Sequence, residues 1–347
     1  MQRLDPPLSW PALPRPAARI GPEPEDFRVD ELPLYEPSGT GSHLWVRLEK
    51  RSLTTPELLQ RVARAAGVSE RDIGSAGMKD KHAVTTQWLS LPENARAPET
   101  WNLPDGARLL EQTRHGNKLR TGHQRGNRFS IRLVAAEPDK QSTQSQILLL
   151  VEKLRAAGLP NYFGPQRFGK GGDNLDAALA WLRGAPRRDR RARFFAKLYP
   201  SVIQSEVFNR FLALRTERGL DRLLPGDVVR LSGSRSLFVV EDAEKESARL
   251  AARDVFLTGP LPGPKLLAAR GEPADLEQAA IAAIGLEPSD LERLGRDAPG
   301  TRRDLVVFPE ALSVTAEPEA SLLLGFELPS GSYATELIRQ LVGPLTR

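Results

Sequence analysis

Residues 76–85 read Ala76-Gly77-Met78-Lys79-Asp80-Lys81-His82-Ala83-Val84-Thr85. The first part of this stretch is too rich in glycine and charge for regular structure, so we expect a loop there. From Val84 onward, the run through Thr86 and Trp88 has the character of a strand. The stretch therefore presents one carboxylate, that of Asp80, in a loop that leads into a strand.

On the N-terminal side of this loop, the sequence predicts two strands and a helix. Residues 27–30 and 44–49 alternate apolar and polar side chains, which is typical of strands with one buried face. Residues 54–57 then supply hydroxyl caps, a proline and an acid, the usual start of a helix. An apolar stripe continues to Ala66, and Gly67 ends the helix. Asp80 is thus expected between a helix and a strand.

On the C-terminal side, a strand over 126–133 and a helix over 144–157 are predicted, and Gly158 closes that helix. The character of the sequence changes there, and we place a domain boundary near residue 158. Beyond it we expect, in order, a glycine-rich loop over 161–172, helices over 175–182 and 201–218, a hairpin over 228–240, a linker or exposed loop over 259–264, strands over 305–308 and 322–326, and a short helix over 335–342.

Composition excludes several classes of protein. The chain has 347 residues, 49 Lys and Arg against 44 Asp and Glu, four His and no Cys. Without cysteine there is no disulfide scaffold, thiolate nucleophile or iron–sulfur cluster. The longest strongly apolar run, residues 147–151, is far shorter than the about 18 residues of a membrane span. Five prolines also interrupt residues 1–16, where a secretory signal needs an apolar segment. We therefore expect a cytoplasmic protein of two domains that does not span a membrane.

Positive charge gathers in two segments. In each of residues 106–132 and 183–197, seven basic side chains face one acidic side chain, a net charge of +6, so the rest of the chain is acidic. One such run is usually a solvated face, but two runs from different regions favour a polyanion such as nucleic acid. The basic residues are Arg108, Arg114, Lys118, Arg120, Arg125, Arg128 and Arg132 in the first segment and Arg183, Arg187, Arg188, Arg190, Arg191, Arg193 and Lys197 in the second.

Asp80 is the chemically distinctive residue. Lys79, Lys81 and His82 flank it in sequence, and cations within about 4–6 Å favour an ionised carboxylate. An ionised carboxylate suits nucleophilic or general-base work. The competing interpretation is an aspartate that only caps the loop onto the following strand.

Two other motifs do not carry chemistry. Residues 164–171 match a nucleotide-binding loop except at Gly171, where a Ser or Thr must hold Mg²⁺. His115 and His123 lie eight positions apart without an acidic partner nearby, which fits a solvated or RNA-facing role better than metal ligation. We therefore expect neither a nucleotide cofactor nor a metal.

Five ordered segments together resemble the TruD family of transfer-RNA pseudouridine synthases. The resemblance implies an α+β fold: a catalytic domain of residues 1–157 plus 309–347, built around an antiparallel or mixed sheet with flanking helices. A family-specific α/β insertion domain over 158–308 would interrupt it. The segments are Glu25-Asp26-Phe27-Arg28-Val29-Asp30-Glu31, residues 76–85, Gly126-Asn127-Arg128-Phe129, Asn161-Tyr162-Phe163-Gly164-Pro165-Gln166-Arg167-Phe168-Gly169 and Leu328-Pro329-Ser330-Gly331-Ser332-Tyr333-Ala334-Thr335.

The same resemblance implies isomerisation of uridine in transfer RNA, at position 13 of the D-arm, without a cofactor. Asp80 would be the nucleophile, and Phe27, Asn127 and Tyr333 would line the uracil site. Attack at C1′ of the ribose, attack at C6 of the base and a glycal path all stay open. The site would draw support from Lys79, Lys81, His82, Phe129 and Arg19.

Some of these residues have plainer interpretations, and two depart from the family pattern. Phe129 lies on the buried face of a predicted strand and fits core packing equally well, and Asn127 follows a glycine and could only shape a turn. Members of the family carry Lys where this chain has Gly21, so Arg19 is the candidate for the missing charge. Tyr333 stands where members often have Phe.

Two rival functions remain. An RNA-binding or RNA-folding factor would carry the same basic segments, although the intact 76–85 loop argues against it. An Asp-dependent nucleoside or glycoside hydrolase requires a second catalytic carboxylate, and none accompanies Asp80 in sequence. For the enzyme we expect the two basic segments to bind tRNA phosphates on either side of a cleft between the domains. The residues we expect to do so are notably Arg114, Lys118, Arg120, Arg125, Arg187, Arg188, Arg190 and Arg191. The oligomeric state stays open, and a monomer is compatible with the sequence.

Overall fold

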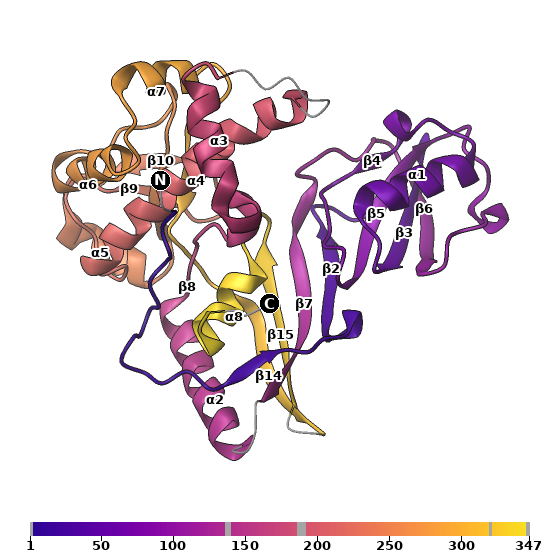
Figure 1. Cartoon of the computed structure of the whole chain (residues 1–347), viewed down its shortest axis with the longest axis horizontal. Coiled ribbons are helices and arrows are strands. Elements are labelled where there is room, and N and C mark those ends of the chain that lie inside the picture. Colours follow the sequence, from indigo (N-terminus) through magenta and orange to yellow (C-terminus); the bar gives the residue numbers. More distant parts are fainter. Residues whose placement is uncertain (1–2, 136–139, 186–191, 319–320, 345–347) are drawn as a thin grey trace. The chain divides into compact units, whose positions relative to one another are not determined.

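A computed structural model describes residues 3–135, 140–185, 192–318 and 321–344 (Figure 1). The chain forms two compact units. The large-sheet unit comprises residues 14–155, 309–334 and 341–347, and the small-sheet unit comprises residues 1–13, 156–308 and 335–340. Helices and strands are mixed in both, so the predicted α+β class is confirmed.

The large-sheet unit is built on a nine-stranded sheet with the order β14-β15-β7-β2-β5-β3-β6, in which β1 also pairs with β7 and β4 with β5. Its neighbouring strands are antiparallel except β2 and β5, which run parallel. The strands are β1 (Ala18–Ile20), β2 (Phe27–Pro33), β3 (His43–Arg51), β4 (Gly74–Ser75), β5 (Val84–Pro92), β6 (Ala107–His115), β7 (Gln124–Ala135), β14 (Glu310–Glu317) and β15 (Ser321–Pro329).

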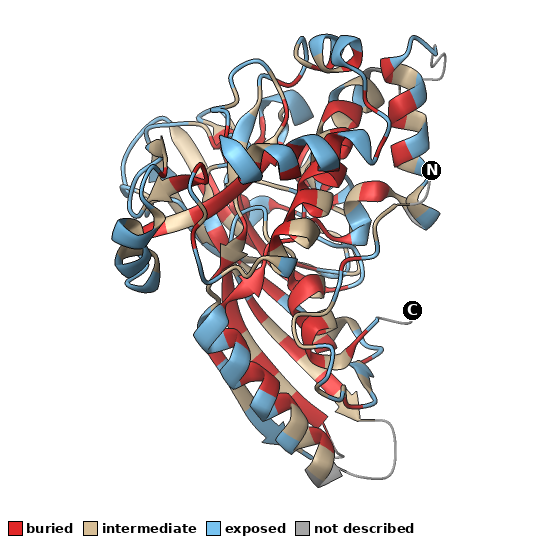
Figure 2. Cartoon of the chain, turned by 90° about the vertical axis from the view of Figure 1, so that its left-hand side faces the viewer, coloured by how far each residue is buried: buried red, intermediate tan, exposed pale blue. Residues whose placement is uncertain are grey.

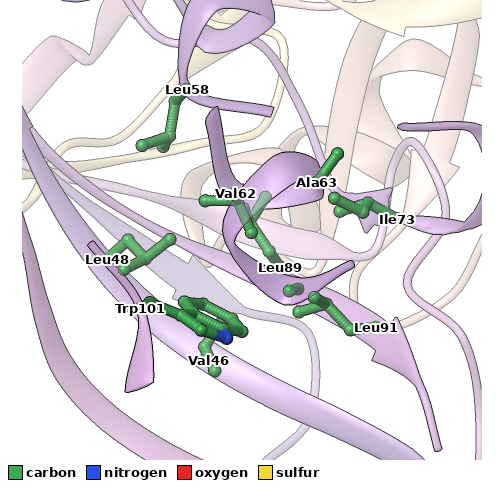
Figure 3. Packing of buried hydrophobic residues seen from close by; sticks show 10 residues of the cluster. Val46, Leu48, Leu58, Val62, Ala63, Ile73, Leu89, Leu91 and Trp101 are labelled. Carbon is green, nitrogen blue, oxygen red and sulfur yellow. The ribbon is translucent and has the colours of Figure 1, made fainter. Parts of the chain in front are cut away.

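Helix α1 (Thr55–Ala66) packs on this sheet and forms as the sequence predicts. Thr54 and Glu57 form a reciprocal capping box, and Gly67 ends the helix in the left-handed conformation at φ 69°. The helix buries Leu58 and Val62 against the β3 and β5 side chains shown in Figure 3, among them Leu48 and Leu89. Burial of this apolar surface fixes the helix that precedes β4 and the 76–83 loop.

The pairing of β7 with β15 joins two segments of the large-sheet unit that lie far apart in the sequence. It runs without a break from Val134 opposite Ser321 to Gly126 opposite Pro329. Helix α2 (Lys140–Ala157) follows β7, and Arg155 donates a hydrogen bond to the Leu312 carbonyl of β14. Figure 2 shows buried residues along one side of α2, which include Ile147 and Leu154.

The small-sheet unit combines a four-stranded sheet of order β10-β9-β11-β12, a two-stranded ladder of β13 and β8, and helices. Long helix α4 packs against α3, α6 and β11. The elements are β8 (Leu159–Pro160), α3 (Asp173–Leu182), α4 (Ala192–Glu217), β9 (Val228–Leu231), β10 (Leu237–Val239), α5 (Ala243–Ala251), β11 (Val255–Leu261), α6 (Gly271–Ala282), α7 (Pro288–Leu294), β12 (Thr301–Asp304) and β13 (Val306–Val307); α8 (Ala334–Val342) closes the chain.

The prediction of a linker or exposed loop over 259–264 was wrong for residues 259–261, which end strand β11, whereas residues 262–264 do lie outside regular structure. Gly259 and Pro260 are buried in β11, which pairs with β12. A Cβ on Gly259 would lie 2.7 Å from the Leu305 side chain and 2.9 Å from that of Phe211. The glycine therefore serves close packing inside the unit rather than a turn.

Two further elements differ from the prediction. Strand β6 lies inside the first basic segment, where charge hid its period-two pattern. Helix α4 starts at Ala192 and runs through Pro200, although the predicted start was residue 201, just after this proline.

Among the described residues, no helix is long and apolar enough to cross a membrane.

Candidate active site

The register of the large sheet places the predicted site residues on one face. Paired residues of neighbouring strands point to the same side of a sheet, and successive residues alternate between its two sides. Glu31 pairs with Asn127 between β2 and β7, Val29 with Phe129 in the same ladder, and Lys50 with Thr85 between β3 and β5. We call this side of the sheet the Asp80 face. A single row across it reads Phe326, Phe129, Val29, Thr85 and Lys50.

The aromatic and amide groups on this face differ in their exposure. Phe129 is 7% exposed and stacks on Phe326 with ring centroids 5.1 Å apart, so it is a core residue. Phe27 is half-buried, and its ring meets Phe129 edge-on with centroids 6.3 Å apart. Within the described part of the chain, the Oδ1 atom of Asn127 is buried and accepts no hydrogen bond. An unused acceptor is expensive to bury unless a ligand pairs with it.

Hydrogen bonds hold the backbone of residues 76–83, which we call the Asp80 loop. The N–H of Lys79 donates to Thr55 Oγ1 over 2.9 Å, and Lys50 Nζ donates to the Asp80 carbonyl over 2.7 Å. Farther along, the N–H of Ser52 donates to the Ala83 carbonyl over 3.3 Å. The side chain of Asp80 remains exposed. These hydrogen bonds therefore fix the backbone on both sides of Asp80, while its carboxylate stays accessible.

Of the cations beside Asp80 in sequence, Lys79 is paired with other residues and Lys81 and His82 are exposed. Lys79 is buried, with its Nζ 2.7 Å from Glu31 Oε2 and donating to Gln124 Oε1 over 2.8 Å. Glu31 also accepts a hydrogen bond from the N–H of Trp88 over 3.1 Å. Among the described residues, no cation lies within 4.0 Å of the Asp80 carboxylate as an ion-pair partner.

The charge of Lys81 acts on Glu57. Hydrogen bonds from Thr54 are the main reason why the pKa of Glu57 is lowered, and the positive charges of Lys81 and Arg61 add to the effect. The charge of Lys81 thus acts on the first turn of α1.

The C-terminal motif lies beside this loop. Gln124, the partner of Lys79, donates from Nε2 to Ser330 Oγ over 3.3 Å, and the N–H of Ser330 donates to the Arg125 carbonyl over 3.0 Å. Tyr333 is half-buried three residues farther on, in the turn between β15 and α8. Lys79, Gln124 and Ser330 thus connect the Asp80 loop to the turn that carries Tyr333.

Position 21 cannot supply a cation in this structure. A Cβ on Gly21 would lie 2.2 Å from Asp26 Oδ2, and Asp26 in turn pairs with Arg132 over 3.1 Å. Arg19 lies on β1 opposite Val134 and is exposed. No hydrogen bond or ion pair joins Arg19 to Asp80 within the described ranges.

Much of the first basic segment is paired with distant carboxylates. Arg108 meets Glu49, Arg114 meets Glu93, and both Arg125 and Arg128 meet Glu327. Lys118 donates to the Arg71 carbonyl over 2.7 Å. Arg120 is exposed in the 116–123 loop, where the N–H of Gly122 donates to the Ala76 carbonyl over 2.9 Å. Of the second segment, Arg187, Arg188, Arg190 and Arg191 lie outside the described residues.

Sequence reasoning missed four residues that shape the site: Lys50, Glu31, Thr55 and Gln124. A signal existed for two of them. Lys50 continues the inward phase of Leu44, Val46 and Leu48, and Glu31 continues that of Phe27 and Val29. A charge on the buried phase of a strand is rare unless it is paired. Among the described residues, no cluster of three or more metal-ligating side chains is present.

Comparison with known proteins identifies relatives over nearly the whole chain. The model of the family described as tRNA pseudouridine synthase D (TruD) matches residues 13–175 and 192–341. A curated protein of that name from Anaeromyxobacter sp. (strain Fw109-5) is 45% identical over 344 residues, which are 97% of this chain and 96% of the relative. Another, from a strain of Thermus thermophilus, is 39% identical, covering 95% and 90%. A crystal structure of a TruD protein from Methanosarcina mazei shares the fold, with a TM-score of 0.75 at 23% identity and coverage of 98% and 96%.

Proposed function

Because the chain belongs to the tRNA pseudouridine synthase D family, it is an isomerase of uridine in transfer RNA, and we propose that it acts on uridine 13 of the D-arm with Asp80 as nucleophile. The observation that carries the proposal is the Asp80 loop, whose backbone is tied to Thr55 and Lys50 while its carboxylate stays exposed. A reactive group on a fixed backbone with an open approach is what a positioned nucleophile requires.

The reaction breaks the N1–C1′ bond of uridine and forms a C5–C1′ bond, and the proton lost from C5 is balanced by one gained at N1. No atoms enter or leave, so the chemistry calls for no redox or group-transfer cofactor. Asp80 acts by attack at C1′, by attack at C6 or along a glycal path. Each requires the carboxylate beside an unstacked nucleotide, and extruding the base costs a few kcal/mol.

Residues of the Asp80 face suit recognition of the extruded base. Phe27 presents a partly exposed ring, and stacking on an aromatic side chain contributes about 1–3 kcal/mol per base. The unused Oδ1 of Asn127 matches the N3–H donor of uracil. Tyr333, in the turn beside Gln124 and Ser330, provides a second aromatic wall.

We assign these roles to the catalytic domain, residues 1–157 plus 309–347, and regard residues 158–308 as the family's insertion. Phe27, Asp80, Asn127 and Tyr333 all belong to the large-sheet unit, which supports this division. The substrate implies a cytoplasmic enzyme.

Replacement of Asp80 tests the assignment directly. Asp80→Asn keeps the shape of the side chain and removes its charge, so we expect pseudouridine at position 13 to disappear while tRNA binding changes little. Carbodiimide mapping of tRNA from a deletion strain that carries the variant measures this. Asp105→Asn, a change of the same kind at another exposed turn position, is the control and should restore modification. Pseudouridine 13 in the Asp80→Asn strain would refute the nucleophile, and full complementation without modification would favour the RNA-folding function.

A further inference from the structure

Lys50 is a buried cation that ends on the Asp80 loop. Its side chain is 0% exposed, and its Nζ donates to the carbonyl of Leu53 over 2.6 Å and to that of Asp80 over 2.7 Å. Leu53 immediately precedes the cap of α1, so one ammonium joins the end of β3, the start of α1 and the Asp80 loop. Neither carbonyl needs a full positive charge to be satisfied, because a neutral donor suffices.

The charge is costly at this position. The pKa of Lys50 is lowered to about 8, mainly by burial and also by the neighbouring charge of Lys79, while the charges of Asp80 and Glu57 partly oppose this shift. The Asp80 carboxylate therefore lies within electrostatic reach of Lys50, although the hydrogen bond from Lys50 goes to the backbone of Asp80. Core packing alone would favour an apolar side chain in this row of the sheet.

We propose that Lys50 is the positioning residue of the nucleophile: its ammonium holds the peptide of Asp80 in place through charge-assisted hydrogen bonds from inside the protein. The proposal rests on the role of Asp80 proposed above. Lys50 touches no substrate, and it acts through the position of Asp80 alone. Its loss should thus slow the chemical step and leave tRNA affinity unchanged.

Single-turnover kinetics of the full chain on tRNA test the proposal. Lys50→Met keeps the length and apolar stem of the side chain and removes both hydrogen bonds and the charge. We expect the rate at saturating enzyme to fall about 10- to 100-fold, with tRNA affinity unchanged and a cooperative thermal unfolding transition retained. Arg61→Met removes an exposed cation from α1 and should leave the rate at the native value.

The pH dependence separates positioning from a purely structural role. The native rate, divided by that of Lys50→Met, should decrease as the pH rises past about 8, because Lys50 then loses its charge and its hydrogen bonds to the two carbonyls weaken. Lys50→Arg stays protonated, so it should recover much of the rate and lose this decrease. If Lys50→Met does not fold, the comparison of Lys50→Arg with the native enzyme decides alone.

Three results would overturn the inference: a native rate for Lys50→Met, a loss confined to tRNA affinity, or the same high-pH decrease in Lys50→Arg as in the native enzyme. The outcome is distinguishable from failure of the proposed function. If Asp80 is not the nucleophile, Asp80→Asn remains active whatever Lys50 does. If only the role of Lys50 is wrong, Asp80→Asn is inactive while Lys50→Met behaves like the native enzyme.

Discussion

At the scale of single residues, the site depends on charges buried where strand alternation calls for apolar side chains. Lys50 and Glu31 both occupy inward positions of their strands, and each reaches a partner on the Asp80 loop. Isolated buried charges cost several kcal/mol, so their presence marks positions that stability alone would not select. Substitutions that raise stability at these two positions are therefore expected to lower activity.

The pH dependence of stability measures the cost of Lys50. Its folded pKa of about 8 lies below the ordinary lysine value of 10.5, so between these values the unfolded chain binds more protons and native stability rises with pH. We expect the free energy of unfolding of the native protein, minus that of Lys50→Met, to increase by about 3 kcal/mol across this window. Urea unfolding without RNA at a series of pH values measures it. If this difference in unfolding free energy does not change with pH, the pKa of Lys50 is not lowered in the folded protein.

At the scale of elements, local sequence defined the frame of the site but not its partners. The hydroxyl caps, proline and acid of residues 54–57 and the alternating runs of β2 and β3 predicted a helix and strands around the Asp80 loop, and these are confirmed. The hydrogen bond of Lys50 spans 30 residues and that of Lys79 to Gln124 spans 45. Such contacts depend on strand order and register, which no local pattern specifies.

Register also decided which predicted residues meet. Phe129 and Asn127 are two positions apart on one strand, yet Phe129 packs in the core while Asn127 keeps a buried, unused acceptor. The prediction of a loop over 259–264 failed at residues 259–261, also because of packing with residues distant in sequence. Composition indicated a loop, but the space beside Phe211 required a glycine inside a strand.

The buried pair of Lys79 and Glu31 ties the Asp80 loop to β2. Lys79→Met leaves the Glu31 carboxylate buried without a counter-charge, which should cost about 3–5 kcal/mol of stability. Adding Glu31→Gln removes that charge and keeps an acceptor for the N–H of Trp88, so the double variant should be more stable than Lys79→Met alone. Chemical denaturation of the native protein, the two single variants and the double variant gives the coupling free energy between Lys79 and Glu31. Additive losses would show that the two groups do not stabilise each other.

At the scale of the whole molecule, the first basic segment is less positive in space than in sequence. Arg128 and Arg132 of this segment occupy positions that alternate with the Asp80 face, and both meet carboxylates there. Folding thus neutralises part of a charge that counts fully in the sequence. Arg120, beside the Asp80 loop, is the better candidate for a phosphate of the tRNA.

Salt dependence of tRNA binding tests this distinction. If Arg120 contacts one phosphate, Arg120→Gln should reduce the slope of log K against log salt concentration by about 1 and weaken binding. Arg28→Gln removes an exposed cation on the opposite side of the sheet, and its slope should equal that of the native protein. Filter binding over a range of salt concentrations measures both. Equal slopes for all three proteins would place the phosphate contacts elsewhere.

The continuous ladder between β7 and β15 has a consequence for synthesis. On the ribosome, β15 follows β7 by about 190 residues, which takes about 10–40 s at usual elongation rates of about 5–20 residues per second. Throughout that interval one edge of β7 has no strand beside it, while residues 156–308 are being synthesised. The nascent chain therefore exposes a strand edge with unpaired backbone N–H and C=O groups for tens of seconds. If the chain is released from the ribosome before residue 321, the fragments should associate through this edge.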